Sequence, residues 1–147
     1  MGESKQLQLI AGGSYQDERG TLKHFNTFNP GDFRRFYIIE QSPSNGPRAW
    51  QGHKTEAKCF YCLKGRFAVL VARIDNWETP GNSPDTTRFD LSGEKNQMLL
   101  VPGGYANGIK ALEKDSQLMV FSEYAMEEAV GDEQRFSKDR WIKWEKI

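Results

Sequence analysis

The fold is decided by the stretch Arg48-Ala-Trp-Gln-Gly-His53-Lys-Thr-Glu-Ala-Lys58, which places one of only two histidines between cationic and acidic side chains just before an apolar run. Such a group of polar side chains beside an apolar segment indicates a small-molecule site. Further along, Val101-Pro-Gly-Gly-Tyr-Ala-Asn-Gly108 is a glycine-rich turn that follows an apolar segment. We expect the two stretches to belong to two facing strands of one barrel.

Short apolar or alternating runs recur along the chain, and glycine, proline and asparagine separate them. A spacing of roughly ten residues between such runs is typical of an antiparallel barrel or sandwich. The sequence therefore predicts an all-β protein with a single domain over residues 1–147. Region 123–134 could hold a helical turn or two, and 75–87 reads as a loop between strands. The apolar runs cover residues 7–10, 33–40, 58–63, 67–74, 97–101 and 118–124.

Composition excludes several classes of protein. The 20 Lys and Arg residues balance the 20 Asp and Glu residues, so no overall basic field is available to hold a nucleic acid. A mean hydropathy of -0.71 and the lack of a long apolar stretch argue against a membrane-spanning helix. The N-terminal residues 1–6 are charged and carry no apolar signal core, which predicts a cytoplasmic protein.

Cys59 and Cys62 have the spacing of a redox or zinc pair, but they lie in a segment that reads as a strand. Side chains three positions apart on a strand point to opposite faces. No second CxxC accompanies them. We expect two small buried or half-buried thiols.

Several motifs occur in a fixed order: Asp17-Glu-Arg19-Gly20, Ile39-Glu-Gln-Ser-Pro-Ser44, Glu56-Ala-Lys58 with Gly65, and Leu91-Ser92 before Val101–Gly108. Together they resemble the cupin family of dTDP-sugar epimerases and isomerases, which includes the dTDP-4-dehydrorhamnose 3,5-epimerases and the dTDP-sugar 3,4-ketoisomerases. The resemblance implies a jelly-roll antiparallel barrel that is open at one end. It also implies a homodimer, because family members exchange or pair N-terminal strands.

The resemblance implies a cofactor-free reaction on a dTDP-linked 4-keto-6-deoxyhexose. A family histidine removes the proton alpha to the C4 ketone, and in the epimerases a tyrosine acts on the opposite face. Here Gln51 stands at the position of that histidine, and His53 aligns with the second histidine of the ketoisomerase motif. The tyrosine position is held by Met119 or Val120, while Tyr124 sits at a later aromatic position.

The chemistry alone favours His53 as the base, since histidine is the usual proton acceptor near neutral pH. The alternative is a rim histidine that only forms hydrogen bonds. Gln51 can orient a substrate oxygen but cannot take the proton. Lys58, in line with the apolar Phe60 and Cys62, is expected to point into the barrel and to stabilise an enolate.

The remaining candidates concern substrate binding. Arg19 and Arg48 can clamp a diphosphate through forked donors, although either could be an ordinary surface arginine. Tyr61 and Tyr105, with Trp50 and Trp77, are placed near the expected mouth, where aromatic rings can stack on thymine. The tyrosine role stays open between Tyr61, Tyr105 and Tyr124.

Asn107 occupies the position of the later histidine of metal-binding cupins and is predicted to bind substrate. With one histidine in the first motif, three metal ligands are hard to assemble, so we predict no metal and no other cofactor. A metal-dependent dioxygenase is disfavoured for the same reason. A non-catalytic sugar-nucleotide-binding cupin is the alternative to an enzyme.

Overall fold

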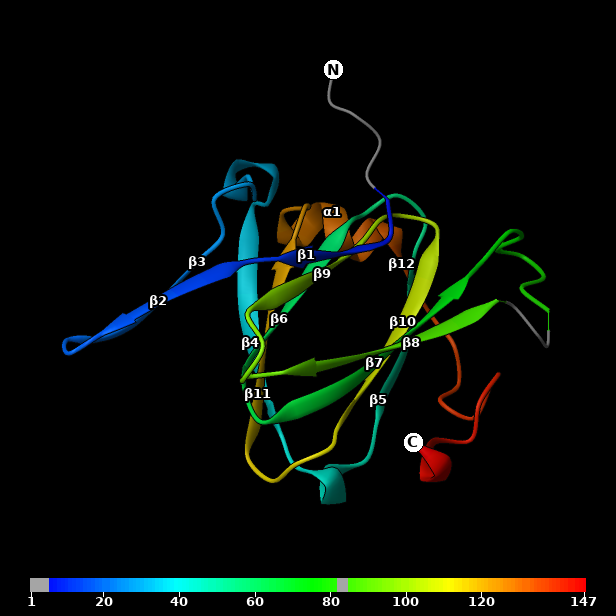
Figure 1. Ribbon diagram of the computed structural model, residues 1–147. Helices are drawn as coiled ribbons and strands as arrows, with labels where there is room; N and C mark the ends of the chain where they lie inside the picture. The colour runs from blue at the N-terminus through cyan, green and yellow to red at the C-terminus, as the bar shows by residue number, and fades with distance from the viewer. Residues whose placement is uncertain (1–5, 82–84) are drawn as a thin grey trace.

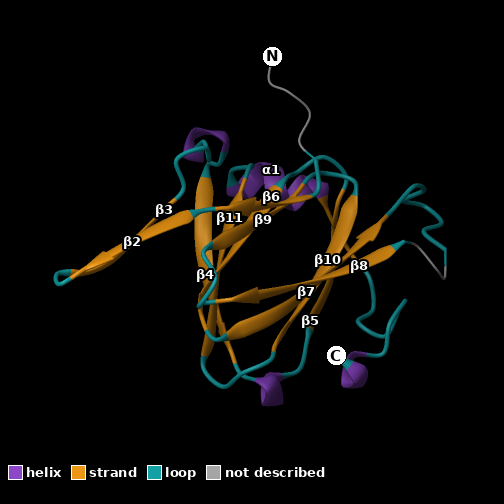
Figure 2. Ribbon diagram, viewed as in Figure 1, coloured by secondary structure: helices purple, strands orange, loops and turns teal. Residues whose placement is uncertain are grey.

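Two five-stranded antiparallel sheets face each other across the molecule (Figures 1 and 2). The computed structural model describes residues 6–81 and 85–147. Residues 1–5, in the stretch without a signal core, and residues 82–84, in the expected 75–87 loop, lie outside the described residues. The first sheet has the strand order β1-β9-β6-β11-β4 and the second β12-β5-β10-β7-β8. This is the predicted all-β architecture of a cupin barrel.

The elements follow the chain in an order dominated by strands, with one short α-helix and three 3-10 turns. They are β1 (Gln8–Ala11), β2 (Gly13–Asp17), β3 (Gly20–His24), η1 (Pro30–Asp32), β4 (Arg35–Gln41), η2 (Pro43–Asn45), β5 (Arg48–His53), β6 (Lys58–Lys64), β7 (Arg66–Arg73), β8 (Thr86–Ser92), β9 (Gln97–Val101), β10 (Tyr105–Ala111), β11 (Ser116–Ser122), α1 (Met126–Asp132), β12 (Glu133–Arg135) and η3 (Trp144–Lys146). None of the helices among these described residues is long and apolar enough to cross a bilayer.

The core between the sheets follows the two-residue alternation of the strands. On β6, Phe60 and Cys62 join the inner apolar cluster, whereas Cys59 belongs to a separate cluster on the outer face. The inner cluster also takes Leu118 and Val120 from β11. Each such side chain contributes about 1.5–3 kcal/mol when fully buried. The two cysteines therefore lie on opposite faces, as predicted.

The β6–β7 turn depends on glycine. Gly65 has φ +75°, a conformation that residues with a Cβ rarely adopt. A Cβ at this position would also collide with the Ser116 side chain. The Ser116 hydroxyl accepts the backbone N–H of Arg66 at 3.1 Å, which fixes the turn against the start of β11.

The C-terminal segment covers the outer face of the second sheet. Trp50 is buried there, with its ring 5.1 Å from Trp141 and 5.6 Å from Trp144. Trp77 packs near Phe136 in the same outer cluster. The expectation that Trp50 and Trp77 stand at the barrel mouth is therefore wrong, because strand alternation turns Trp50 away from the lumen.

Three further expectations need correction. β5 and β10 are hydrogen-bonded neighbours in one sheet, with Tyr105 opposite His53, and do not face each other across the barrel. Residues 105–108, taken as part of a turn, begin the strand β10. The strands predicted from apolar runs did not include β8 or the β2–β3 hairpin, and this hairpin extends away from the barrel in Figure 1. Polar residues alternate along β8 and along the hairpin strands, so neither forms an apolar run. Region 123–134 does contain the short helix α1.

Candidate active site

A cavity of about 270 Å³ lies in the barrel lumen, between the two sheets and next to α1. Strand alternation directs side chains of β4, β6 and β10, and Gln51 and His53 of β5, toward it. Arg48 of β5 lines the same cavity because the β5–β10 register shifts between Arg48 and Gln51. The site residues predicted from sequence that line it are His53, Lys58, Arg48, Gln51 and Asn107. The structure thus brings together four side chains of the consecutive strands β5 and β6 with Asn107 of β10, about fifty residues further along the chain.

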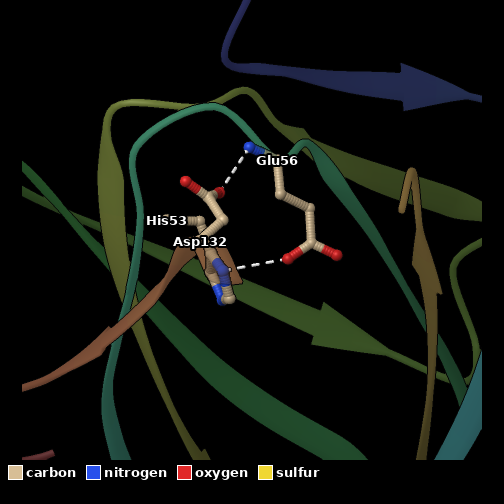
Figure 3. Close-up of side chains that lie close together, drawn as sticks. All are labelled: His53, Glu56 and Asp132. Atoms are coloured by element: carbon tan, nitrogen blue, oxygen red, sulfur yellow. Dashed lines mark hydrogen bonds and ion pairs between the residues drawn. The ribbon is translucent and has the colours of Figure 1, made fainter. Parts of the chain in front are cut away.

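His53 ends β5 and is only 4% exposed. Its Nδ1 atom lies 2.9 Å from Oε1 of Glu56, which is 1% exposed, so the two form a buried pair (Figure 3). The distance between these two atoms defines the pair. The Ser122 hydroxyl donates to the other carboxylate oxygen of Glu56. The Nε2 atom of His53 has no hydrogen-bond partner within the described part of the chain.

Glu56 remains acidic despite its burial. Desolvation by itself would raise the pKa of Glu56, but the contacts from His53 and Ser122 and the positive charge of Lys58 hold that pKa below its usual value. The carboxylate is therefore ionised near neutral pH. An anion fixed beside Nδ1 favours a proton on that nitrogen.

Lys58 is 4% exposed at the start of β6 and points into the lumen, as predicted. Its Nζ atom donates to the Tyr37 hydroxyl at 3.2 Å and lies 3.5 Å from Oε1 of Gln51. Both acceptors are neutral oxygens. A buried ammonium with neutral acceptors can stabilise an oxyanion that develops next to it.

The charge of the lining favours an anionic ligand. Four cations, Arg35, Arg48, Lys58 and Arg135, line the cavity together with one carboxylate, Glu133. A concave wall with such an excess of cations attracts anions. Arg35 and Arg135 were missed in the sequence because neither lies in a family motif, although Arg35 occupies an inward position on β4.

The other predicted residues lie outside this cavity in the single chain. Arg19 is on the β2–β3 turn, where its side chain is 82% exposed and pairs with Asp17 at 2.7 Å. The Tyr61 hydroxyl donates to Asn96 at 2.9 Å on the outer face of β6. The Tyr124 hydroxyl donates to Thr55 at 2.8 Å. None of the three side chains Arg19, Tyr61 and Tyr124 lines the cavity.

Tyr105 and Val120 are the residues to consider for the tyrosine that the epimerases use and that this chain lacks at the aligned position. Tyr105 lies across the strand pair from His53 and packs against the inner core. Of the two residues aligned with the epimerase tyrosine, Val120 lines the cavity, whereas Met119 alternates to the other face of β11. An aliphatic side chain therefore occupies this wall, and it cannot transfer a proton.

A third acidic or basic side chain beside His53, Asp132 of α1, was not predicted from the sequence. One donor atom from each of His53, Glu56 and Asp132 lies within 4.8 Å of the others. Asp132 accepts the backbone N–H of Glu56 at 2.8 Å (Figure 3). It also accepts the backbone N–H of Thr55 at 3.1 Å. Asp132 therefore holds the loop that follows His53 through its backbone N–H groups.

Barrel and lumen define the class of protein by its fold, a cupin-type barrel with a cationic cavity. The chain belongs to the family described as WxcM-like, C-terminal (FdtA), which matches residues 5–141. A search of curated protein sequences found no match.

Solved structures share the fold at low sequence identity. A dTDP sugar isomerase from Desulfovibrio desulfuricans G20 is 18% identical with a TM-score of 0.74, over 98% of this chain and 94% of that one. The rmlC epimerase of Mycobacterium tuberculosis is 18% identical with a TM-score of 0.74, over 98% and 78% of the two chains. A mutant of the 3,4-ketoisomerase QdtA from Thermoanaerobacterium thermosaccharolyticum, in complex with TDP-4-keto-6-deoxyglucose, is 18% identical with a TM-score of 0.71, over 88% and 87%.

Proposed function

We propose that the protein is an isomerase of a dTDP-linked 4-keto-6-deoxyhexose and that it works by proton transfer without a metal or other cofactor. One observation carries the proposal. Nε2 of His53, which has no hydrogen-bond partner among the described residues, and the buried ammonium of Lys58 belong to the same cationic cavity. A base and an oxyanion stabiliser that are buried in one site are what enolisation of a ketone requires.

The reaction follows from these roles. Nε2 of His53 takes the C3 proton of the sugar, and the electron pair of the C–H bond forms an enolate over C3 and C4. Lys58 stabilises the negative charge on the C4 oxygen, and Gln51 orients it. Return of the proton to C3 on the opposite face gives an epimer. Return to C4, with the O3 proton passing to O4, moves the carbonyl to C3.

We favour the second outcome, 3,4-ketoisomerisation. Inversion at C3 requires an acid on the face opposite His53, and Val120 stands where the epimerases carry their tyrosine. A single base can serve ketoisomerisation because one proton leaves C3 and one arrives at C4. Two phenols are candidates to share this work: Tyr37, whose hydroxyl accepts a hydrogen bond from Lys58 in the cavity, and Tyr105, which lies opposite His53 on the neighbouring strand.

The cations that line the cavity provide the groups that would bind the substrate. Arg48 with Arg35 suits the diphosphate, because forked guanidinium donors match phosphate oxygens. Arg19 is remote from the lumen of its own chain. It can contribute only if the hairpin of a second copy reaches the cavity, which agrees with the expected homodimer.

A non-catalytic sugar-nucleotide binder is the second candidate. Gln51 and Val120 favour it, since both positions that transfer protons in the family have lost that ability. Incubation with dTDP-4-keto-6-deoxyglucose in the presence of a chelator separates the two, with product analysis by NMR. A new sugar isomer supports the enzyme, whereas unchanged substrate that nevertheless binds supports the binder. Activity lost to the chelator and restored by a metal would contradict the cofactor-free reaction.

A further inference from the structure

Glu56 has an unusual position for a carboxylate. It is 1% exposed, on the loop between β5 and β6, three residues after the proposed base. A buried carboxylate is costly unless its oxygens are satisfied. Each oxygen of Glu56 faces a different group: Oε1 lies next to Nδ1 of His53, and Oε2 accepts a hydrogen bond from the Ser122 hydroxyl. Ser122 is itself fully buried on β11.

The loop that carries Glu56 is held from two further sides. Asp132 of α1 accepts the backbone N–H groups of Thr55 and Glu56. Glu123, just after β11, accepts the backbone N–H of Ala57 at 3.0 Å. The carboxylate of Glu56 is thus fixed through its side chain and its backbone, and it has little freedom to leave His53.

This arrangement sets which nitrogen of His53 carries the proton. A carboxylate opposite Nδ1 stabilises an N–H there, which leaves the lone pair on Nε2. Nε2 has no partner within the described residues, and the ring lines the cavity. We propose that Glu56 is a positioning residue that holds His53 in the tautomer protonated on Nδ1, so that Nε2 is available to substrate. The inference rests on the proposed function, in which His53 is the base.

The tautomer is measurable without any reaction. The chain has only two histidines, so ¹⁵N NMR of labelled protein resolves His53 once a His24→Gln variant removes the other signal. In the wild type we expect the shifts of a ring protonated on Nδ1. In Glu56→Gln we expect a shift toward the Nε2-protonated tautomer, because the amide can offer its own N–H to Nδ1. A wild-type ring protonated on Nε2 would overturn the proposal.

Kinetics supply the second measurement. Glu56→Gln should lower the rate of proton exchange into the sugar nucleotide about a hundredfold or more, with nearly unchanged nucleotide affinity. The matched control is Glu127→Gln, which neutralises an exposed carboxylate of α1 outside the cavity and should exchange at the wild-type rate. Exchange in Glu56→Gln at the wild-type rate would refute the role of Glu56. A wild type without exchange would refute the proposed function alone, and the NMR result would still decide the tautomer.

Discussion

At the scale of single residues, His53 was predictable and its partner was not. A histidine among charged side chains in a family motif is visible in the sequence, and so is the inward direction of Lys58. Glu56 pairs with His53 only because the loop between them bends back on itself, and no periodic pattern encodes such a bend. Arg35 was not predicted as a site residue for a related reason, since its position in the lumen depends on how β4 crosses the barrel.

Glu56 makes stability sensitive to acid. The fold holds the pKa of Glu56 below its ordinary value of 4.5, so the unfolded chain binds this proton more readily. The stability from the ionised carboxylate is complete above that value and is lost as the pH falls through the lower folded pKa. Urea unfolding should therefore show that the wild-type advantage over Glu56→Gln at about pH 7 shrinks below about pH 4. An advantage that grew on acidification would contradict this reading.

Arg48 gives a prediction about ligand binding. If its guanidinium holds the diphosphate, Arg48→Ala should weaken dTDP binding by about 1.5–3 kcal/mol, the range of hydrogen bonds to charged groups. Calorimetry with dTDP measures this directly. Arg88→Ala is the control, because Arg88 pairs with Asp90 on β8 and does not line the cavity. Equal affinity in the two variants would remove Arg48 from the site.

At the scale of elements, strand alternation was the reliable guide. It correctly predicted the inward face of β6 and the opposite directions of the two cysteines. It failed for β8 and the β2–β3 hairpin, because polar residues dominate strands that lie at an edge or stand away from the core. It also could not tell whether β5 and β10 face each other or pair, since pairing depends on contacts remote in sequence.

The cysteines test the assignment of β6. Burial raises the pKa of Cys59 to about 12 and that of Cys62 to about 11, so both stay protonated in the folded protein. The native chain should not react with an aromatic disulfide reagent at about pH 8, whereas guanidinium-unfolded chain should release two equivalents. Rapid reaction of native protein would show that β6 is exposed.

At the scale of the whole molecule, the barrel leaves apolar surface exposed on one side. Tyr15 and Leu22 of the β2–β3 hairpin are exposed, as are Phe36 and Ile38 of the edge strand β4. Apolar residues on a free edge strand and a projecting hairpin commonly mark an interface. The predicted homodimer would cover them and bring Arg19 near a partner.

The dimer is testable in solution. Sedimentation equilibrium should give twice the chain mass of 16.8 kDa for the wild type. The double variant Phe36→Ser with Ile38→Ser should dissociate it, because polar side chains remove the apolar contact. Substituting the exposed Lys138→Ser and Lys143→Ser of the C-terminal segment, which covers the other sheet, provides a control that should stay dimeric. A wild-type monomer at micromolar concentration would contradict the dimer and the role of Arg19.

The central claim is that His53 moves a proton of the bound sugar, and solvent exchange tests it most directly. Wild-type protein is incubated in D₂O with dTDP-4-keto-6-deoxyglucose, and NMR follows the C3 proton. We predict that the wild type removes the C3 proton, so that deuterium appears at C3 of recovered substrate or at C4 of the 3-keto product, and that the rate falls by about a hundredfold or more in His53→Gln, which should bind dTDP almost as tightly. Undiminished loss of the C3 proton in His53→Gln, or an unchanged C3 proton with wild-type protein that binds the substrate, would contradict the claim.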